Sequence, residues 1–332
     1  MGEGAPDRTI PTASRARAGV VRALLRCAIA ALGFACGGPG SGGGSSQDYG
    51  LDGIEFAAGQ FVAVGDREAI VRSTDGVTFT EQHTRRSGGS LTAIAFGDGL
   101  WLASGAQGVV ETSADGVAWV AQATPLGTTI QGAAWGSGVW VLVGDHGVAF
   151  RSTNAAEWSS VVSGARFDLL DVTFADGRFV AVGEQGEIVS SADGETWMLE
   201  QAGLSVDLRG VVWGGGQFVA VGDRGTLLTS PDGRTWTPEL SPVGRNLEDV
   251  AYANGLYVVV ADKGITLTSP DGVTFERHDT GTGYHLLGVA QGQGGFVAVG
   301  RTSPDYDRVA PVLLRSTNGV DWIELDPPAP GG

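Results

Sequence analysis

The sequence predicts an all-β fold of seven repeated units, and three observations support that prediction. The run FVAVGDREAIVRSTDGVTF at 61–79 recurs, with changes, as FVAVGEQGEIVSSADGETW at 179–197 and FVAVGDRGTLLTSPDGRTW at 218–236. Each unit begins on an aliphatic residue, at intervals of 39 or 40 residues: Leu51, Leu91, Ile130, Leu169, Leu208, Leu247 and Leu286. Runs such as FVAVG are apolar on both sides, which is typical of strands buried on both faces. Sheets repeated face to face around an axis form a β-propeller, so seven units predict seven blades.

Each unit is predicted to contain four short antiparallel strands. In residues 91–122 the runs LTAIAF, LWLAS, VVETS and VAWVAQ are separated by GDG, GAQG and ADG, which are hairpin signals. No stretch of the repeats has helical periodicity. We expect the first strand of each unit to lie innermost and the fourth outermost. A straight β-solenoid is the alternative, but its repeats are usually shorter and need end caps.

The repeat also sets the limits of the domain. Its register runs from Leu51 to near Leu325, and the last unit carries an insertion of 8 residues. We therefore expect one propeller over residues 51–326, followed by a tail at 327–332. Because each unit is contiguous in sequence, the ring should close by packing of the first blade against the seventh, without a shared strand.

The third turn of each unit has the pattern Ser-x-Asp-Gly-x-x-aromatic, as in Ser73 to Phe79 and Ser230 to Trp236. This pattern resembles the Asp-box of BNR repeats, found in sialidase-like propellers and in propellers of the photosystem II assembly-factor type. The resemblance covers residues 51–325 and implies a fold rather than a function. The usual box has one more residue before the aromatic. We interpret the box as a structural turn, because Asp and Asn side chains accept backbone N–H groups nearby: Asp75, Asp115, Asn154, Asp193, Asp232, Asp271 and Asn318.

The N-terminal region has the features of an export signal. Residues 1–36 are Arg-rich at the start and then contain the short apolar run CAIAALGFAC, which is too short to span a bilayer. We interpret this segment as a signal peptide of the lipoprotein type with Cys36 as the lipidated residue. Plain secretion and an uncleaved leader are the alternatives. Residues 37–50 read as a Gly/Ser-rich linker, so we expect an exported protein of the cell envelope.

Composition excludes several classes of function. The chain has 21 basic and 37 acidic residues, a net charge of −16, which argues against nucleic acid and against anionic membrane surfaces as partners. Membrane contact is expected only through the lipid at Cys36. Both cysteines lie in the leader, so we expect neither disulfides nor thiolate metal sites in the propeller. No metal-ligand spacing or nucleotide-binding motif occurs, so we expect no metal and no cofactor.

One face of the propeller is the better candidate for binding. The second-to-third turns and the blade-to-blade loops share this face and vary among the units, and loops on a rigid frame commonly carry function. The insertion of the seventh unit lies there too. The candidate ligand-binding or partner-binding residues are Arg301, Asp305, Tyr306, Arg308, Tyr284, His285, Arg224 and His146. Ordinary solvated turn residues are the alternative interpretation.

The sequence favours a non-enzymatic function: a monomeric scaffold that binds a protein or glycan partner. A hydrolase of the sialidase or glycosidase class is the first alternative. Sialidases use three Arg, a Tyr–Glu pair and a further acidic residue, but their early Arg-Ile-Pro motif is absent and only five Tyr are present. No catalytic residue is therefore assigned. An assembly factor for a membrane-protein complex is the second alternative.

Overall fold

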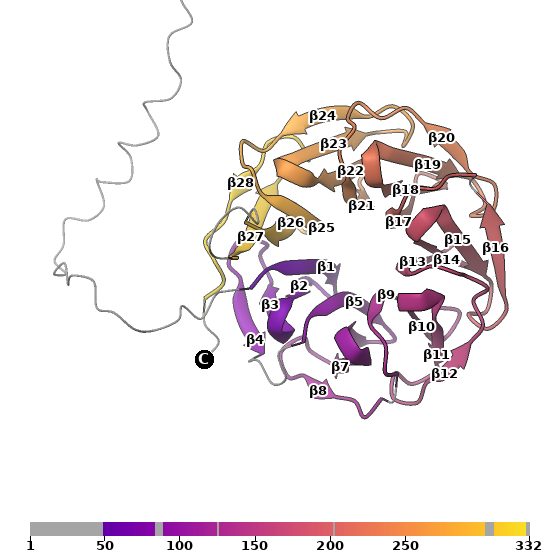
Figure 1. Cartoon of the computed structure of the whole chain (residues 1–332). Helices are drawn as coiled ribbons and strands as arrows, with labels where there is room; N and C mark the ends of the chain where they lie inside the picture. Colours follow the sequence, from indigo (N-terminus) through magenta and orange to yellow (C-terminus); the bar gives the residue numbers. More distant parts are fainter. Residues whose placement is uncertain (1–48, 84–88, 125, 202, 303–308, 330–332) are drawn as a thin grey trace, which may run out of the picture. The chain divides into compact units, whose positions relative to one another are not determined.

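The computed structural model describes residues 49–83, 89–124, 126–201, 203–302 and 309–329. Within these residues the chain forms seven four-stranded antiparallel sheets arranged as blades around a ring (Figure 1). The strand order in every sheet follows the order of the chain. The prediction of a seven-bladed β-propeller is confirmed. The leader, Cys36 and residues 37–48 of the linker lie outside the described residues.

Blades are numbered 1 to 7 in chain order, and the first strand of each lies nearest the centre of the ring (Figure 1). These inner strands are β1 (Leu51–Ala57), β5 (Leu91–Gly97), β9 (Ile130–Gly136), β13 (Leu169–Ala175), β17 (Leu208–Gly214), β21 (Leu247–Ala253) and β25 (His285–Gly292). The second strands are β2 (Gln60–Gly65), β6 (Leu100–Gly105), β10 (Val139–Gly144), β14 (Arg178–Gly183), β18 (Gln217–Gly222), β22 (Leu256–Ala261) and β26 (Gly295–Arg301).

The third and fourth strands complete each blade toward the rim. The third strands are β3 (Ala69–Ser73), β7 (Val110–Ser113), β11 (Ala149–Ser152), β15 (Glu187–Ser191), β19 (Thr226–Ser230), β23 (Ile265–Ser269) and β27 (Pro311–Ser316). The outer strands are β4 (Thr80–His83), β8 (Val120–Ala121), β12 (Ser159–Val161), β16 (Trp197–Gln201), β20 (Thr237–Glu239), β24 (Glu276–Asp279) and β28 (Ile323–Glu324).

Short 3₁₀ turns join the second and third strands where the sequence suggested simple turns. In the described part of the chain they are η1 (Asp66–Glu68), η2 (Ala106–Gly108), η3 (Asp145–Gly147), η4 (Glu184–Gly186), η5 (Asp223–Gly225) and η6 (Asp262–Gly264). We call the side of the ring that carries these turns the η face. No helix of the described residues is long and apolar enough to cross a membrane.

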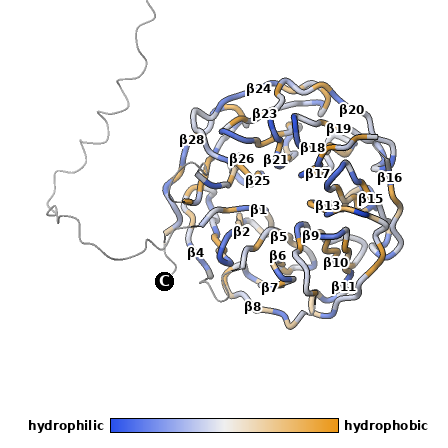
Figure 2. Tube along the Cα trace, in the orientation of Figure 1, coloured by the Kyte–Doolittle hydropathy of each residue, from blue (hydrophilic) through white to orange (hydrophobic). Residues whose placement is uncertain are grey.

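The hydrophobic core lies between neighbouring blades. Val180 and Val182 of β14 are fully buried and pack with Leu208 and Phe218 of blade 5. Because both faces of a second strand meet a sheet, β10 is buried at every position, whereas the outer strand β24 is mostly exposed. Figure 2 shows the same contrast, with apolar colour along β10 and hydrophilic colour along β24. The double burial expected for runs such as FVAVG is confirmed.

Both ends of the described chain extend blade 1 beyond the predicted limits. Tyr49, which the sequence placed in the linker, is only 1% exposed, and its hydroxyl donates to Glu81 Oε1 at 2.9 Å. Ala329, placed in the tail, forms a parallel bridge with Thr80 of β4. Glu81 N–H donates to the Ala329 carbonyl and Ala329 N–H to the Phe79 carbonyl, both at 2.9 Å. Ring closure therefore includes a backbone pairing, because the open edge of β4 offers N–H and C=O groups that an extended segment satisfies.

Candidate functional site

Every inner strand has a β-bulge one residue after the aliphatic residue that begins its repeat, which is the second residue of six strands and the third residue of β25. In β1, Leu51 pairs with Gly65 and Gly53 with Val64, which leaves Asp52 as the extra residue. Bulges re-aim side chains and are common beside functional sites. The same shift occurs in all seven inner strands, and we call the bulged residues the mouth ring: Asp52, Thr92, Gln131, Leu170, Arg209, Glu248 and Leu287.

A cavity of about 380 Å³ lies at the centre of the ring, lined by the inner strands of all seven blades. All seven mouth-ring residues line it on the η face, and Phe56 and Tyr252 line it toward the other end of the strands. Among the described residues that line it are five carboxyl groups and one guanidinium. The charged members are Asp52, Glu55, Asp171, Glu248, Asp249 and Arg209. The cavity is therefore polar and strongly acidic.

Two of these carboxylates join neighbouring inner strands. Oδ1 of Asp171 and Oδ1 of Asp249 each accept the N–H of the following residue at 2.7 Å. Oδ2 of Asp171 accepts the N–H of Val211 in blade 5, and Oδ2 of Asp249 accepts that of Val289 in blade 7, both at 2.8 Å. Each Asp thus bridges its own strand and the next one. Counted from the first residue of each repeat, Asp171 and Asp249 are at the third position, where the five other inner strands carry Gly or Ala: Gly53, Ala93, Gly132, Gly210 and Gly288.

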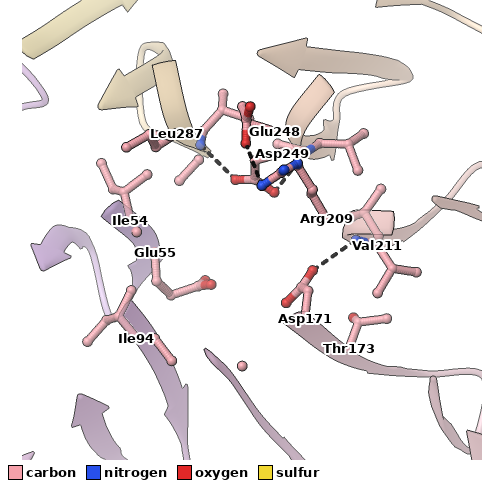
Figure 3. A pocket seen from close by; sticks show the side chains of 18 of the residues that line it. Ile54, Glu55, Ile94, Asp171, Thr173, Arg209, Val211, Glu248, Asp249 and Leu287 are labelled. Atoms are coloured by element: carbon pink, nitrogen blue, oxygen red, sulfur yellow. Dashed lines mark hydrogen bonds and ion pairs between the residues drawn. The ribbon is translucent and has the colours of Figure 1, made fainter. Parts of the chain in front are cut away.

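Glu55 breaks the repeat at the fifth position of β1. Its side chain points into the cavity toward Asp171 and Asp249 (Figure 3). The same position is small or apolar, or a threonine, in the other inner strands: Ala95, Ala134, Thr173, Val212, Ala251 and Ala290. A carboxyl group at this position is therefore a feature of blade 1 alone and is unnecessary for forming a blade.

Arg209 is the cation of the mouth ring. Its Nε forms an ion pair with Asp223 Oδ1, and its Nη1 lies 3.5 Å from Glu248 Oε2. It therefore connects η5 with the inner strands of blades 5 and 6. In blades 2, 3 and 4 the mouth-ring residues Thr92, Gln131 and Leu170 carry no charge. The charged mouth-ring residues thus lie in blades 5, 6 and 1, with Leu287 of blade 7 between Glu248 and Asp52.

Arg301 forms a second ion-pair group at the seam of the ring. Arg301 directly follows Gly300 in the second strand of blade 7. The equivalent position in blade 1, directly after Gly65, is occupied by Asp66. The guanidinium of Arg301 forms an ion pair with Asp52 of the mouth ring, and its Nη1 lies 3.9 Å from Asp66 Oδ2. The substitution of Arg for an acidic residue at this place joins blade 7 to blade 1.

Burial, which removes water from the cavity carboxyl groups, is the largest cause of the shifts in their pKa values. Burial raises the pKa of Asp171 to about 6, of Glu55 to about 7 and of Asp249 to about 8, from ordinary values of 3.8 to 4.5. Charge repulsion from Asp171 adds to the rise in the pKa of the other two. Burial also raises the pKa of Glu248 to about 7 and of Asp52 to about 6, although Arg209 and Arg301 respectively oppose the shift. We therefore expect these carboxyl groups to titrate closer to neutral pH than ordinary Asp and Glu side chains.

The structure places Arg224 and His146, two sequence-predicted candidates, at the centres of η5 and η3. Both are exposed and adopt a left-handed backbone, with φ of 58° and 61°. Their backbone N–H groups donate to the side chains of the residues before the next inner strands, Asn246 at 3.2 Å and Asp168 at 2.6 Å. These two candidates rim the η face and do not line the cavity.

Two further candidates lie between blades 6 and 7. His285 Nδ1 lies 2.8 Å from Asp262 Oδ1, and the Tyr284 hydroxyl donates to Glu324 Oε1 at 3.1 Å. Neither Tyr284 nor His285 lines the cavity. Arg301, described above, is the candidate that reaches the mouth ring. The remaining candidates, Asp305, Tyr306 and Arg308, and the rest of the insertion at 303–308 lie outside the described residues.

The Asp or Asn of each third turn organises the backbone of that turn. Asp193 Oδ1 accepts the N–H groups of Glu195 and Thr196, both at 2.9 Å, and a hydrogen bond from Ser191 Oγ at 3.0 Å. The same two backbone bonds occur at the other six positions: Asp75, Asp115, Asn154, Asp232, Asp271 and Asn318.

The inner-strand carboxyls Asp52, Glu55, Asp171, Glu248 and Asp249 are the residues that the sequence prediction missed. A signal for three of them was present in the repeat. The third and fifth positions of the inner strands are mostly Gly, Ala or Val, so the acidic exceptions stand out once the units are aligned. Loop variation drew attention to the rim, whereas these exceptions lie inside strands that look structural.

This chain is similar in fold to several proteins of known structure. No protein-family model matches the sequence, and no curated protein matches it. The chain is similar to the solved structure of YCF48 bound to a D1 peptide, with a TM-score of 0.66 and 17% identity over 82% of this chain and 95% of that one. It is also similar to YCF48 from Cyanidioschyzon merolae, with a TM-score of 0.61 and 17% identity over 81% and 96%. A computationally designed protein, Ika8, has a TM-score of 0.60 and 11% identity over 86% and 91%. These likenesses support the propeller fold and leave function to the site itself.

Proposed function

We propose that this chain is a non-enzymatic propeller that binds an extended segment of a protein partner at the mouth of the central cavity. The observation that carries the proposal is the mouth ring, where seven bulged residues surround a polar cavity on the η face. A rigid frame with a central cavity at one face provides a preformed site of the kind that ligands use. The similarity to a propeller solved with a bound peptide supports a protein as the partner.

The charge of the η face indicates what the partner segment should carry. In the described part of the chain, five carboxyl groups line the cavity together with one cation, Arg209, which is already engaged with Asp223 and Glu248. Acidic groups also crowd η4, where burial, followed by repulsion from Asp168 and Asp207, raises the pKa of Glu184. Complementary charge favours association and specificity. We therefore expect a segment with Lys or Arg side chains.

The proposal includes a location for the protein and bears on the two alternative functions, an assembly factor and a hydrolase. We place the protein at the cell envelope, exported through residues 1–36 and anchored by a lipid on Cys36. Assembly of a membrane-protein complex is compatible with a partner segment bound at the mouth. No specific observation favours a hydrolase: the Tyr284 hydroxyl bonds to Glu324, and neither residue lines the cavity. Labelling with radioactive palmitate, compared between the wild type and Cys36→Ser, tests the anchor.

The binding site can be tested with two matched arginine substitutions. Leu170→Arg gives the mouth of blade 4 the residue that blade 5 has at that position, with Glu184 placed as Asp223 is for Arg209. Val117→Arg gives the opposite face, in the third turn of blade 2, the residue that blade 5 has there as Arg234. Val117 is 44% exposed, so we expect the control substitution to leave the fold unchanged.

A random peptide library displayed on phage and selected on the wild-type protein should yield segments enriched in Lys and Arg. We expect Leu170→Arg to weaken binding of a selected peptide at least tenfold, about 1.4 kcal/mol. Val117→Arg should leave its affinity unchanged. Equal affinity for both variants would place the site elsewhere. Selection of no peptide, together with binding on a glycan array, would replace the protein partner by a glycan.

A further inference from the structure

Three carboxyl groups on separate blades converge inside the cavity: Glu55, Asp171 and Asp249 (Figure 3). We propose that they form a proton-operated clamp on the inner strands. When protonated, the three groups do not repel one another, and the hydrogen bonds of Asp171 and Asp249 hold β13 against β17 and β21 against β25. When ionised, the three groups repel one another and push β1, β13 and β21 apart across the cavity, which strains both bonds. The clamp is a property of the free protein and does not depend on the proposed partner.

The clamping contacts are the two hydrogen bonds between strands. Asp171 Oδ2 accepts from Val211 N–H and Asp249 Oδ2 from Val289 N–H. Each oxygen of these carboxyls accepts one backbone N–H, and a carboxyl group has about four lone-pair positions. A proton can therefore bind on the cavity side of either Asp without displacing a backbone bond. Glu55 makes no bond to a neighbouring strand that the structure records, so its main effect on the pair is through charge.

The surrounding charges determine how the clamp responds. Glu55 of β1, Asp171 of β13 and Asp249 of β21 face one another across the cavity (Figure 3). Among the described residues, the other charged side chains that line it are Asp52 of β1, Glu248 of β21 and Arg209 of β17. Arg301 of β26 lies just outside, paired with Asp52 and Asp66, and Asp223 and Asp262 lie near Glu248. The two cations are thus held by carboxylates of the mouth. Full ionisation of the three inner groups would leave three negative charges facing one small cavity.

The sign of the pH effect follows from the raised pKa values. A buried carboxyl that binds its proton more tightly when folded than when unfolded stabilises the fold at low pH. That stabilisation declines as the pH rises from the unfolded value, about 4, through the folded value. For Asp171, Glu55 and Asp249 the folded pKa values are about 6, 7 and 8. The N–H groups that Asp171 and Asp249 accept favour the ionised form and lower the pKa of both groups, but burial raises it more.

The principal test compares Glu55→Ala with Thr173→Ala. Alanine is the residue at the equivalent position of four other blades, so Glu55→Ala should fold, and Thr173→Ala removes an uncharged side chain at the same position. Urea unfolding is measured at intervals from pH 4.5 to 8.5. For each group between its unfolded and folded pKa, the ratio of folded to unfolded protein should fall up to tenfold per pH unit. Glu55→Ala should remove one group's share of this dependence, whereas Thr173→Ala should keep the wild-type dependence.

A second experiment measures carboxyl titration and amide exchange directly in the folded protein. Carbon-13 NMR of the three carboxyl groups should show titration above pH 5.5. Hydrogen exchange at the Val211 and Val289 amides, corrected for the intrinsic effect of pH, should accelerate over the same range and accelerate less in Glu55→Ala. Ordinary titration near pH 4, or exchange at these two amides that is independent of carboxyl ionisation, would overturn the proposal. So would equal pH dependence of stability in the two variants.

Discussion

At the scale of single residues, the third turns repeat one small hydrogen-bonded device seven times. In blade 4 the carboxylate of Asp193 binds the N–H groups of Glu195 and Thr196, and Ser191 Oγ accepts the N–H of Gly194 at 2.9 Å. These N–H groups lower the pKa of Asp193, because they stabilise the ionised form. In blade 3, Asn154 makes the same two backbone bonds without a charge. The geometry of the turn therefore depends on the acceptor oxygen rather than on the charge.

This comparison gives a residue-scale prediction for Asp193. Replacement by Ala removes the acceptor of two backbone N–H groups and should lower the free energy of unfolding by about 1–2 kcal/mol. Asp193→Asn keeps the acceptor and should change stability by less than about 0.5 kcal/mol, as the turn with Asn154 suggests. Urea unfolding at pH 7 measures both. Similar losses in the two variants would mean that the charge matters more than the acceptor.

At the scale of the element, the inner strands combine a bulge at one end with close packing at the other. The bulge turns the mouth-ring side chain of each strand toward the cavity. At the other end, small residues give space for the aromatic side chain of the next blade. A Cβ added to Gly136 would lie 2.0 Å from Cγ of Phe174, so an alanine cannot fit without movement of that ring. Phe174 itself packs on Phe179, with ring centroids 4.6 Å apart.

Gly136→Ala should therefore destabilise the propeller by about 1–3 kcal/mol through overpacking between blades 3 and 4. Gly244→Ala is the matched control, because a Cβ at Gly244 meets no atom within 4 Å. Combining Gly136→Ala with Phe174→Leu should recover part of the loss, since the smaller side chain gives the new methyl group space. The midpoint of urea unfolding is the measurement. A loss that Phe174→Leu does not reduce would locate the strain in the backbone instead.

At the scale of the whole molecule, the ring closes where blade 7 meets blade 1. On the η face, the guanidinium of Arg301 pairs with Asp52 of the mouth ring. At the rim, Ala329 pairs with the backbone of Phe79 and Glu81. Core contacts join the same two blades, because Val297 and Val299 of β26 pack in one cluster with Leu51, Phe61 and other side chains of blade 1. Closure thus uses ion pairs inside, apolar contacts between the sheets and backbone pairing outside.

Deletion of residues 326–332 should weaken this seam. The truncated chain loses the two hydrogen bonds of Ala329 to blade 1, and its unfolding free energy should fall by about 1–3 kcal/mol. Deletion of 330–332 alone leaves Ala329 in place and is the control. Hydrogen exchange should show faster opening at the Glu81 amide only in the longer deletion. If both truncations behave like the full chain, the pairing at the rim contributes nothing measurable to closure.

Much of the fold could be predicted because each blade is specified locally. The hairpins depend on Gly and Asp at short spacing, and the doubly buried runs of β10 and β14 are visible as apolar stretches. Seven repeats at intervals of 39 or 40 residues predicted the number of blades. The limits at Tyr49 and Ala329 were missed because their burial and pairing depend on blade 1, which lies far from Ala329 in the chain.

The sequence by itself therefore determined the blade, its strands and their number, since these depend on contacts within about 40 residues. The tertiary structure decided what the blades form together. Glu55, Asp171 and Asp249 lie more than 70 residues apart in sequence and meet only because the ring brings the inner strands around one axis. Their raised pKa values likewise arise from shared burial, which no local pattern encodes. Closure of the ring places three acidic residues from different repeats in one cavity, where their charges affect one another.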